Sequence, residues 1–383
     1  MTTAGSHSHG KPAVNVTDRL KSRNPEDFSI PSPRDEEWRF TPLDRLRDLH
    51  TISPSGSAVD ISVVASDPVQ VDVVGRDDAR LGVAFEPVDR PSAAAWAGFD
   101  KATVITVPRD AVVEEPVMVT LQGTGATGSA HVRIDVQAFA SATIVLDHQG
   151  SAVVSTNVEV TVGDSASLNL ITVHDWEDDA VHLSHLQHRV GRDAVLKSTV
   201  VTLGGSVVRV VPAVQYAGPG GQATLTGLYF ADAGQHLEHR TLVDHNQANC
   251  KSNVIYKGAL QGEEGNESRT VWFGDVLIRA NAIGTDTYEM NRNLVLGDHA
   301  RADSVPNLEI ETGEIVGAGH ASATGRFDDE QLFYLMARGI TSEEARKLVV
   351  RGFFAEIIDQ LGVPELSERL RASVERELVG ANA

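Results

Sequence analysis

GDSASL at residues 163–168, GRDAVL at residues 191–196 and GGQATL at residues 220–225 form the pattern that decides the fold. In each copy a glycine is followed three positions later by an alanine, and the three alanines are 28 and 29 positions apart. Stacked rungs produce this near-constant spacing of a turn glycine and a small inward residue, because each rung buries its face only against its neighbours. The repeat therefore predicts a β-solenoid.

The residues around this repeat support the same fold. From about Ala102 onward, runs such as TVITV, HVRIDVQAF and NVEVTV are rich in β-branched residues between turn residues. Ala142 precedes Ala166 by 24 positions, and GDHARA at residues 297–302 is a later echo of the repeat. The 4 Trp, 5 Tyr and 11 Phe are few, which suits a narrow interior filled by Val, Leu, Ile and Ala. A β-sandwich shares some of these features.

The segment before the repeats is interpreted as an N-terminal arm and a helical or mixed segment, residues 1–100. Thr41 followed by Pro42 has the pattern of an N-cap and a first helical position. Leu43, Leu46 and Leu49 then recur at helical spacing, so a helix is predicted to begin there. The β-solenoid core is predicted over residues 101–326.

Residues 327–383 are predicted to form a C-terminal helical domain. Asp328 with Gln331 and Thr341 with Glu344 have the spacing of capping boxes, which begin helices. A third helix is predicted from about Pro364, with an apolar stripe at every fourth position formed by Leu366, Leu370, Val374 and Leu378. These helices are expected to cap the last rung of the solenoid or to bind a partner.

Charge and composition exclude several classes of protein. The 383 residues carry a formal net charge of −20 and a pI near 5.1, which disfavours nucleic acid and anionic membrane surfaces as partners. No apolar run approaches the roughly 18 residues that cross a bilayer, and the N-terminus lacks the apolar core of a signal peptide. We therefore expect a cytoplasmic protein. Cys250 is the single cysteine, which excludes an internal disulfide and all-cysteine metal sites.

The sequence contains one nucleotide-binding pattern in the wrong context and lacks another. Gly123, Gly125 and Gly128 match the dinucleotide fingerprint GxGxxG, but the residues that follow predict a strand where the fingerprint requires a helix. The phosphate-binding pattern GxxxxGK[ST] does not occur. The chain is therefore not predicted to bind a dinucleotide or to hydrolyse ATP by itself.

Two histidine runs resemble metal sites at first sight. They are His182, His185 and His188, and His236, His239 and His245. A spacing of three on a strand places neighbours on opposite faces, so the three members of either run are not predicted to converge. They are interpreted as surface or stacking residues, and a zinc hydrolase is kept as an alternative.

The C-terminal third resembles the SufB/SufD family of iron–sulfur cluster assembly proteins. The resemblance is carried by FGDVLI (273–278), TDTYEMNRNLVLGDHARADSVPNLEIE (285–311), GHASATGRFDDEQLFYLMARGI (319–340) and ARKLVVRGFFAEII (345–358). Weaker likeness extends to EEWRFTPL (36–43), WAGFDKATVITVP (96–108), VVEEPV (112–117) and DHNQANCKSN (244–253). The single cysteine and modest length are more similar to the SufD branch than to the SufB branch.

The resemblance implies a right-handed parallel β-helix that pairs with a SufB-like chain. It also implies that a SufC-type ABC ATPase docks on the C-terminal helices, and Phe333, Tyr334, Arg338 and Phe353 are the candidate docking residues. The chain itself is expected to be non-catalytic. A β-helix carbohydrate-active enzyme and a SufB-like homodimeric scaffold are the alternatives.

The resemblance also implies one ligand residue. In the family, the segment matching GAGHASATG contributes a histidine near the subunit interface, often with a cysteine two residues before it. His320 matches this histidine and is the candidate ligand for iron or a cluster, while the cysteine position holds Ala318. Cys250 matches a cysteine of SufD-like chains, and Glu289 stands where the family commonly has glutamine. The chain alone is expected to bind no cofactor, and a transient iron–sulfur cluster is expected only in the complex.

Overall fold

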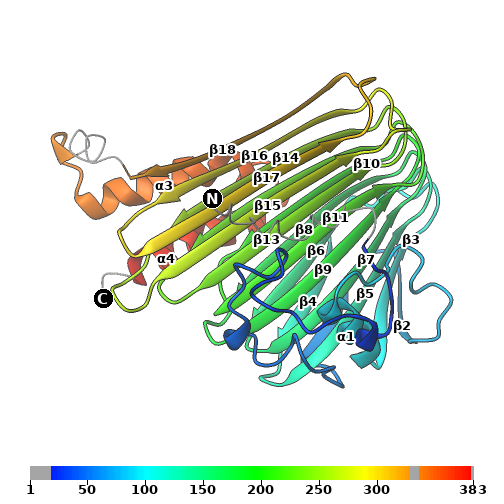
Figure 1. Cartoon of the computed structure of the whole chain (residues 1–383), viewed down its shortest axis with the longest axis horizontal. Helices are drawn as coiled ribbons and strands as arrows, with labels where there is room; N and C mark the ends of the chain where they lie inside the picture. The colour runs from blue at the N-terminus through cyan, green and yellow to red at the C-terminus, as the bar shows by residue number, and fades with distance from the viewer. Residues whose placement is uncertain (1–18, 328–335, 381–383) are drawn as a thin grey trace, which may run out of the picture.

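The computed structural model describes residues 19–327 and 336–380, and it confirms the predicted β-solenoid. Two nine-stranded sheets face each other across one hydrophobic core (Figure 1). The first, sheet A, contains in spatial order β1 (Val59–Val64), β4 (Val117–Gly123), β6 (Ser141–Gly150), β8 (Ser167–Trp176), β10 (Val195–Thr202), β12 (Gln222–Ala231), β14 (Lys251–Leu260), β16 (Asp286–Val295) and β18 (Gly317–Arg326).

The second sheet, sheet B, supplies the other half of every rung. It contains β2 (Gln70–Gly75), β3 (Lys101–Val107), β5 (Thr127–Val136), β7 (Val153–Val162), β9 (Val181–Val190), β11 (Val207–Tyr216), β13 (His236–His245), β15 (Ser268–Ile278) and β17 (Ala300–Ile310). From β3 and β4 onward, neighbouring strands within each sheet are parallel, because the chain passes through the other sheet before it returns.

The repeat identifies the inward face correctly but not every rung length. Leu168 pairs in register with Leu196, as the spacing of 28 predicts. Leu196, however, pairs with Ala223, and Ala142 pairs with Leu168, so these two registers differ by two residues from the spacing of the alanines. Side chains alternate with a period of two, so a shift of two keeps the same residues in the core. All four side chains are buried there.

The two ends of the solenoid differ. At the N-terminal end, β1 and β2 add antiparallel strands of six residues to the two sheets. At the C-terminal end, β18 and β17 are the outermost strands, and no strand within the described ranges pairs with their outer edges. We call this the open end, defined by β17 and β18. It presents strands of eleven and ten residues, respectively.

The helix predicted from Thr41 is wrong. Only a 3-10 turn, Leu43–Arg45, forms there, and the positive φ angles of Arg47 and Asp48, 49° and 65°, break the helical path. The Thr41 hydroxyl donates instead to the buried Glu238 carboxylate at 2.7 Å. The Thr41 side chain, which would have capped a local helix, is therefore bonded to Glu238, 197 positions away in the sequence.

The N-terminal segment covers the outer face of sheet B. Trp38, Leu46 and Leu49 pack on Val181, Leu183 and Val207, so two of the three predicted leucines are buried, and Leu43 partly buried, without forming a helix. Helix α1 (Arg90–Gly98) contacts β5, β7 and β9 on the same face. It is capped by Asp89, whose carboxylate accepts a hydrogen bond from the Ser92 backbone N–H.

Two described helices follow the solenoid. Helix α3 (Ser342–Ile358) begins with the predicted capping box of Thr341 and Glu344, which is confirmed. Helix α4 (Pro364–Gly380) begins where it was predicted, and its apolar stripe is buried. The capping box at Asp328 and Gln331 lies outside the described residues. No helix in the described part of the chain is long and apolar enough to cross a membrane.

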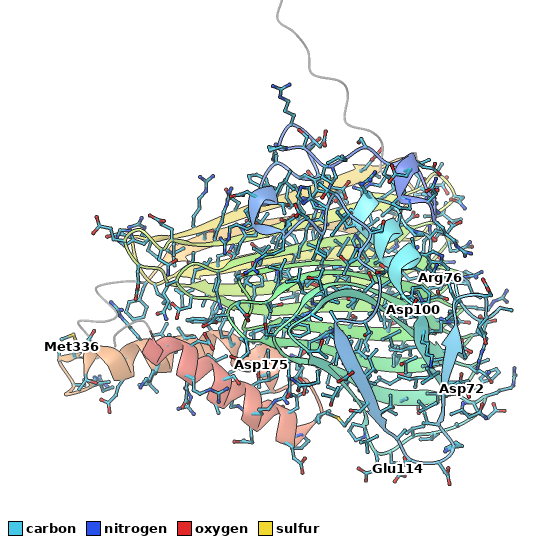
Figure 2. The ribbon with its side chains drawn as sticks, turned by 90° about the horizontal axis from the view of Figure 1, so that it is seen from below. Asp72, Arg76, Asp100, Glu114, Asp175 and Met336 are labelled. Atoms are coloured by element: carbon cyan, nitrogen blue, oxygen red, sulfur yellow. The ribbon has the colours of Figure 1, made fainter. Side chains whose placement is uncertain are left out.

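The prediction that the C-terminal helices cap the last rung is wrong for α3 and α4. They lie along the outer face of sheet A, on the side opposite to the N-terminal segment (Figure 2). The reason is an apolar outer face, to which Val145, Ile171, Val201, Leu228 and Phe230 contribute buried side chains beneath the helices. These helices bury the face of sheet A and leave the open end uncovered by the described chain.

Candidate functional site

The candidate site is the interior of the open end. Parallel, in-register pairing places residues of β18 on the same face as their partners in β16, so alternate side chains of β18 point into the solenoid. The Ser322 hydroxyl confirms this direction, because it donates across the interior to the Ser304 hydroxyl of β17 at 2.8 Å. The last rung is thus an open layer whose inward side chains have neighbours on one side only among the described residues.

His320 lies in this open layer. It pairs in register with Glu289, which pairs in turn with Val254 one rung deeper. His320 is exposed, whereas Glu289 is only 1% exposed. The imidazole therefore faces inward at the mouth of the solenoid, where a partner covering the open end would meet it.

Glu289, one rung below the open layer, has a buried carboxyl group in an unusual environment. Neither of its carboxylate oxygens has a hydrogen-bond partner among the residues that the structure describes. Burial, with a smaller contribution from Asp275, raises the pKa of Glu289 to about 8. A Cβ at Gly274 would collide with the Glu289 carboxylate and with the Trp272 ring, so glycine makes room for both side chains. A glutamine at position 289 would fill this place without adding an ionisable group.

The structure does not bring Cys250 to His320. The Cys250 side chain is fully buried in the core, with Sγ 3.5 Å from the Ala248 carbonyl oxygen and 3.7 Å from the Gly218 carbonyl oxygen. Its register row lies four positions before the row of Val254, Glu289 and His320, which is about 13 Å along the strands. Burial raises the pKa of the thiol. Cys250 therefore behaves as the small apolar core residue that a lone thiol usually is.

Ala318 occupies the position where the resemblance expects a cysteine. It pairs with Thr287, faces inward like His320, and packs half-buried against the core. Its methyl group offers no ligand atom. Within segment 317–326, His320 is thus the candidate ligand, because its imidazole carries a nitrogen of the kind that binds metals.

Two of the four candidate docking residues, Arg338 and Phe353, belong to the described part of the chain. Phe333 and Tyr334 lie outside the described residues. Arg338 is exposed just before α3, and Phe353 is half-buried against the helix-covered face of sheet A. Lys257 of β14 donates to the Phe353 carbonyl at 3.3 Å and to Glu356 at 2.6 Å. Phe353 therefore already helps to fix α3 on the solenoid.

The members of each histidine run are divided between the two faces of their strand. In the first run, His182 and His188 point into the core, whereas His185 points outward to the Asp89 carboxylate at 3.0 Å. In the second, His239 bonds Thr202 across the interior, and His236 lies near Glu238 on the outer face. The prediction that neither run converges is confirmed.

Sequence reasoning missed a different histidine cluster. His148 and His174 pair in register on β6 and β8, and His182 from sheet B meets them inside the core. Their ligand nitrogens lie within 4.8 Å of one another. In the sequence, this pairing is indicated by the 26-residue separation of His148 and His174, which equals the rung length between β6 and β8.

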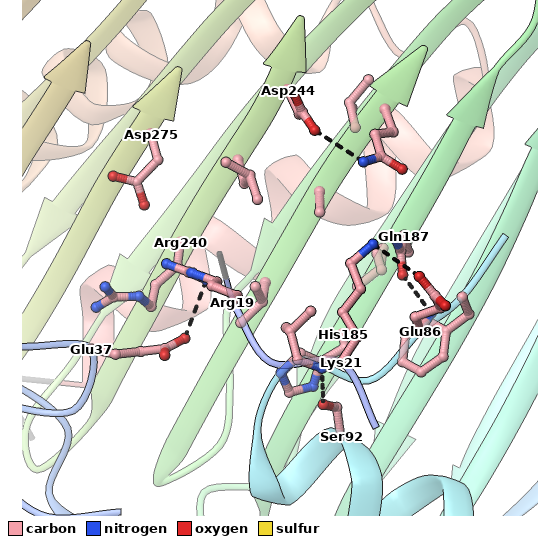
Figure 3. A pocket seen from close by; sticks show the side chains of 18 of the residues that line it. Arg19, Lys21, Glu37, Glu86, Ser92, His185, Gln187, Arg240, Asp244 and Asp275 are labelled. Carbon is pink, nitrogen blue, oxygen red and sulfur yellow. Dashed lines mark hydrogen bonds and ion pairs between the residues drawn. The ribbon is translucent and has the colours of Figure 1, made fainter. Parts of the chain in front are cut away.

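A pocket between the N-terminal segment and the outer face of sheet B is lined by charged residues (Figure 3). Arg279 forms two hydrogen bonds with Asp244, both at 2.6 Å, and Arg19 lies 3.6 Å from Glu37. These charges neutralise one another, so the pocket provides weaker support for a catalytic or ion-binding site than the open end does.

The fold and the open layer define a class of protein that matches a known family. The family model described as "SUF system FeS cluster assembly, SufBD core domain" matches residues 119–353. The chain belongs to this SufBD family of iron–sulfur cluster assembly proteins.

Three relatives illustrate the range of the family. An iron-sulfur cluster assembly SufBD family protein of Mycobacterium leprae is 54% identical over 372 residues, covering 96% of this chain and 95% of the relative. The iron-sulfur cluster assembly protein SufD of Escherichia coli is 27% identical over 386 residues, covering 92% and 90%. A second SufBD family protein of M. leprae is 28% identical over 224 residues, which cover 58% of this chain and 25% of that protein.

Proposed function

We propose that this chain is a non-catalytic, SufD-like subunit of an iron–sulfur cluster assembly complex. It pairs with a SufB-like chain through its open end and docks a SufC-type ATPase through its C-terminal helices. The observation that carries the proposal is the open end itself, where two long strand edges surround an inward-facing, exposed histidine.

An open solenoid end requires a cover. Long, unprotected strand edges pair readily with other chains, and proteins normally shield them. The inward apolar residues of the last rung, among them Ala302, Leu308 and Ala318, are only partly buried against the core. A second chain with β-structure at its own edge would complete both the strand pairing and the burial. This supports an interface at β17 and β18.

The partner must supply most of the cluster ligands. Iron–sulfur clusters are held mainly by cysteine thiolates. The single thiol of this chain, Cys250, is buried away from His320, so this subunit offers an imidazole and the partner offers the thiolates. The two distinct SufBD family proteins of M. leprae support such a pairing, since one is similar to this chain along its length and the other over only part of it.

ATP hydrolysis belongs to a third chain, because this sequence lacks the phosphate-binding pattern of such ATPases. Helices α3 and α4 leave a small surface pocket between them, lined by residues that include Arg351, Asp359 and Arg371. This pocket, together with Arg338 before α3, supports the C-terminal helices as the docking surface. We place the assembled complex in the cytosol.

Anaerobic co-expression with the SufB-like and SufC-like chains of the same genome tests the proposal. The three chains should co-purify, and failure to do so would overturn it. Ser304→Arg, which places a charged side chain in the open layer, should release the SufB-like chain. Glu114→Arg changes an exposed residue between β3 and β4, at the other end of the solenoid, and should leave the complex intact.

Two alternatives give different results. A SufB-like homodimeric scaffold would show twice the mass of one chain in solution without any partner, and Ser304→Arg would convert it to a monomer. A carbohydrate-active β-helix enzyme would bind or degrade soluble polysaccharides. Membership of the SufBD family favours the assembly role over this second alternative.

A further inference from the structure

The core of the solenoid contains a second group of potential metal ligands, far from the open end in the chain. His148 and His174 come from adjacent strands of sheet A, and His182 comes from β9 just after the turn that follows β8. The ring centroids of the three histidines are separated by 4.5, 5.1 and 5.0 Å. All three side chains are 0% exposed. The fold thus concentrates three imidazoles at one corner of a rung.

The hydrogen bonds of these rings leave ligand atoms free. Nδ1 of His148 lies 2.8 Å from the Val173 carbonyl oxygen and must carry a proton to bond it, so Nε2 keeps its lone pair. That Nε2 and both ring nitrogens of His174 have no hydrogen-bond partner in the described part of the chain. A buried polar group without a partner is costly, so a ligand that takes up these lone pairs would stabilise the site.

His182 is held differently. Its Nδ1 accepts a hydrogen bond from Trp176 Nε1 at 3.1 Å, and its Nε2 lies 2.8 Å from the Thr156 hydroxyl. His182 would therefore become a third ligand by exchanging one of these bonds. Nitrogens bound to one ion at about 2 Å lie closer together than 4.8 Å, so binding would also draw the three rings inward.

The surroundings decide which ion fits. All three imidazoles are fully buried, where the neutral form that binds metals is favoured over the charged one. The residues that point inward beside them are uncharged: Leu146, Thr172, Trp176 and Ser184. An ion here keeps its full charge in a medium of low polarity, and that cost rises with the square of the charge. Monovalent ions are therefore preferred to divalent ones.

We propose that His148, His174 and His182 form a buried site for monovalent copper. Copper is well suited to imidazole ligands, and a charge of +1 is the smallest that a metal ion can bring into this uncharged pocket. The site is separate from the open layer and requires no partner chain. It therefore goes beyond the proposed assembly function and can be tested on the isolated chain.

Loading must occur as the chain folds. The interior between this cluster and the open end is filled by Tyr229, Tyr256 and Trp272, which are fully buried. A bound ion should thus exchange slowly and resist chelators in the folded protein. This property separates a buried site from copper held at the surface.

The experiment uses the isolated full-length chain carrying Cys250→Ser, which removes the competing thiol. The protein is expressed in cells grown with added copper, purified under anaerobic conditions with a Cu(I) chelator present, and measured by elemental mass spectrometry. We expect about one copper per chain, reduced roughly tenfold or more by His174→Leu, because loss of even a group that only supports a metal ligand lowers metal affinity by about tenfold or more. His188→Leu is the matched control, because His188 is also buried and faces inward but lies outside the cluster.

X-ray absorption at the copper edge should show nitrogen ligands with imidazole scattering and no sulfur. His174→Leu should fold, since it removes two nitrogens without partners, and its thermal stability is checked without copper. If the His174→Leu variant does not fold, the absorption spectrum of the parent protein still shows whether imidazole nitrogens bind the copper. Absence of chelator-resistant copper, equal copper in the His174→Leu and His188→Leu proteins, or stoichiometric zinc in place of copper would each overturn the proposal.

Discussion

His320 and Glu289 pair in register on the last two strands of sheet A, with the exposed imidazole one rung above the buried carboxyl group. Their strands are parallel, so both side chains point into the solenoid. Glu289 is closed off by β18, while His320 remains open because no strand in the described ranges covers it. The same structural position is therefore a core position in one rung and an interface position in the next.

His320→Ala should leave the three-chain complex intact but lower its iron and sulfide content about tenfold, because loss of even a group that only supports a metal ligand lowers metal affinity by about tenfold or more. Iron and acid-labile sulfide are measured after anaerobic co-expression. Ser322→Ala, on the same inward face of β18, is the control and should keep the content of the parent. His320→Cys should retain part of the cluster, because a thiolate is also a cluster ligand. Unchanged content in His320→Ala would reduce His320 to a structural residue.

The sequence predicts the solenoid because the glycine–alanine pattern of each rung is local and recurs along the chain. The alanines at 166 and 194 follow turn glycines at the rung spacing, and burial of one face is enough to produce that pattern. The register between rungs is harder to predict from the sequence. Leu196 pairs with Ala223, although the repeat would align it with Leu225. Both choices keep the same inward face, so the hydrophobic pattern cannot distinguish them.

Contacts between residues far apart in the sequence could not be predicted, because local patterns do not reveal them. Thr41 has the local pattern of a helix cap, and only its pairing with Glu238 reveals its role. His148 and His174 are each isolated in the sequence, and their meeting depends on rung lengths that vary along the chain. The family resemblance predicts both the candidate ligand His320 and the unusual residue Glu289, whereas only the register shows that Glu289 lies directly beneath His320.

Gly258→Ala should destabilise the solenoid by about 1–3 kcal/mol, the usual cost of overpacking a core. Gly258 pairs in register with Tyr229, and Gly227 pairs with Tyr256, so each ring lies over a glycine of the neighbouring rung. A Cβ at Gly258 would collide with the Tyr229 ring. Urea unfolding measures the effect. Gly325→Ala, where a Cβ would meet open space, should change stability by no more than about 0.5 kcal/mol, and equal losses in both variants would contradict this account.

Thr41→Val should destabilise the protein by about 1–3 kcal/mol, because it removes a hydrogen-bond donor from a buried carboxylate. Burial alone would raise the pKa of Glu238, but Arg209 and further neighbours hold it well below its usual range, so this carboxylate is ionised. Denaturant unfolding at neutral pH is the measurement. Thr51→Val is the control, since the Thr51 hydroxyl bonds a nearby carbonyl at the surface, and it should cost no more than about 0.5 kcal/mol. A larger loss for Thr51→Val than for Thr41→Val would refute the role assigned to Thr41.

The docking of α4 on sheet A should weaken as the pH rises from about 4.5 to about 7. Burial, followed by the nearby carboxylates of Asp232, Asp178 and Asp175, raises the pKa of Glu377 to about 7. The folded state therefore holds this proton more tightly than the unfolded state, whose glutamate has a pKa near 4.5. The neutral form fits the folded protein at acidic pH, and the penalty for ionising Glu377 grows between about pH 4.5 and 7 before it levels off.

Glu377→Gln should remove this penalty. The variant should match the parent in stability near pH 4.5 and exceed it at pH 8 by on the order of 1 kcal/mol, a value reduced by partial exposure to solvent. Urea unfolding across this pH range measures the difference. Glu368→Gln on the same helix is the control, because the Glu368 side chain is 80% exposed, and it should show no such trend. A stability difference between Glu377→Gln and the parent that stays constant with pH would show that the carboxyl group of Glu377 is not what limits α4 docking.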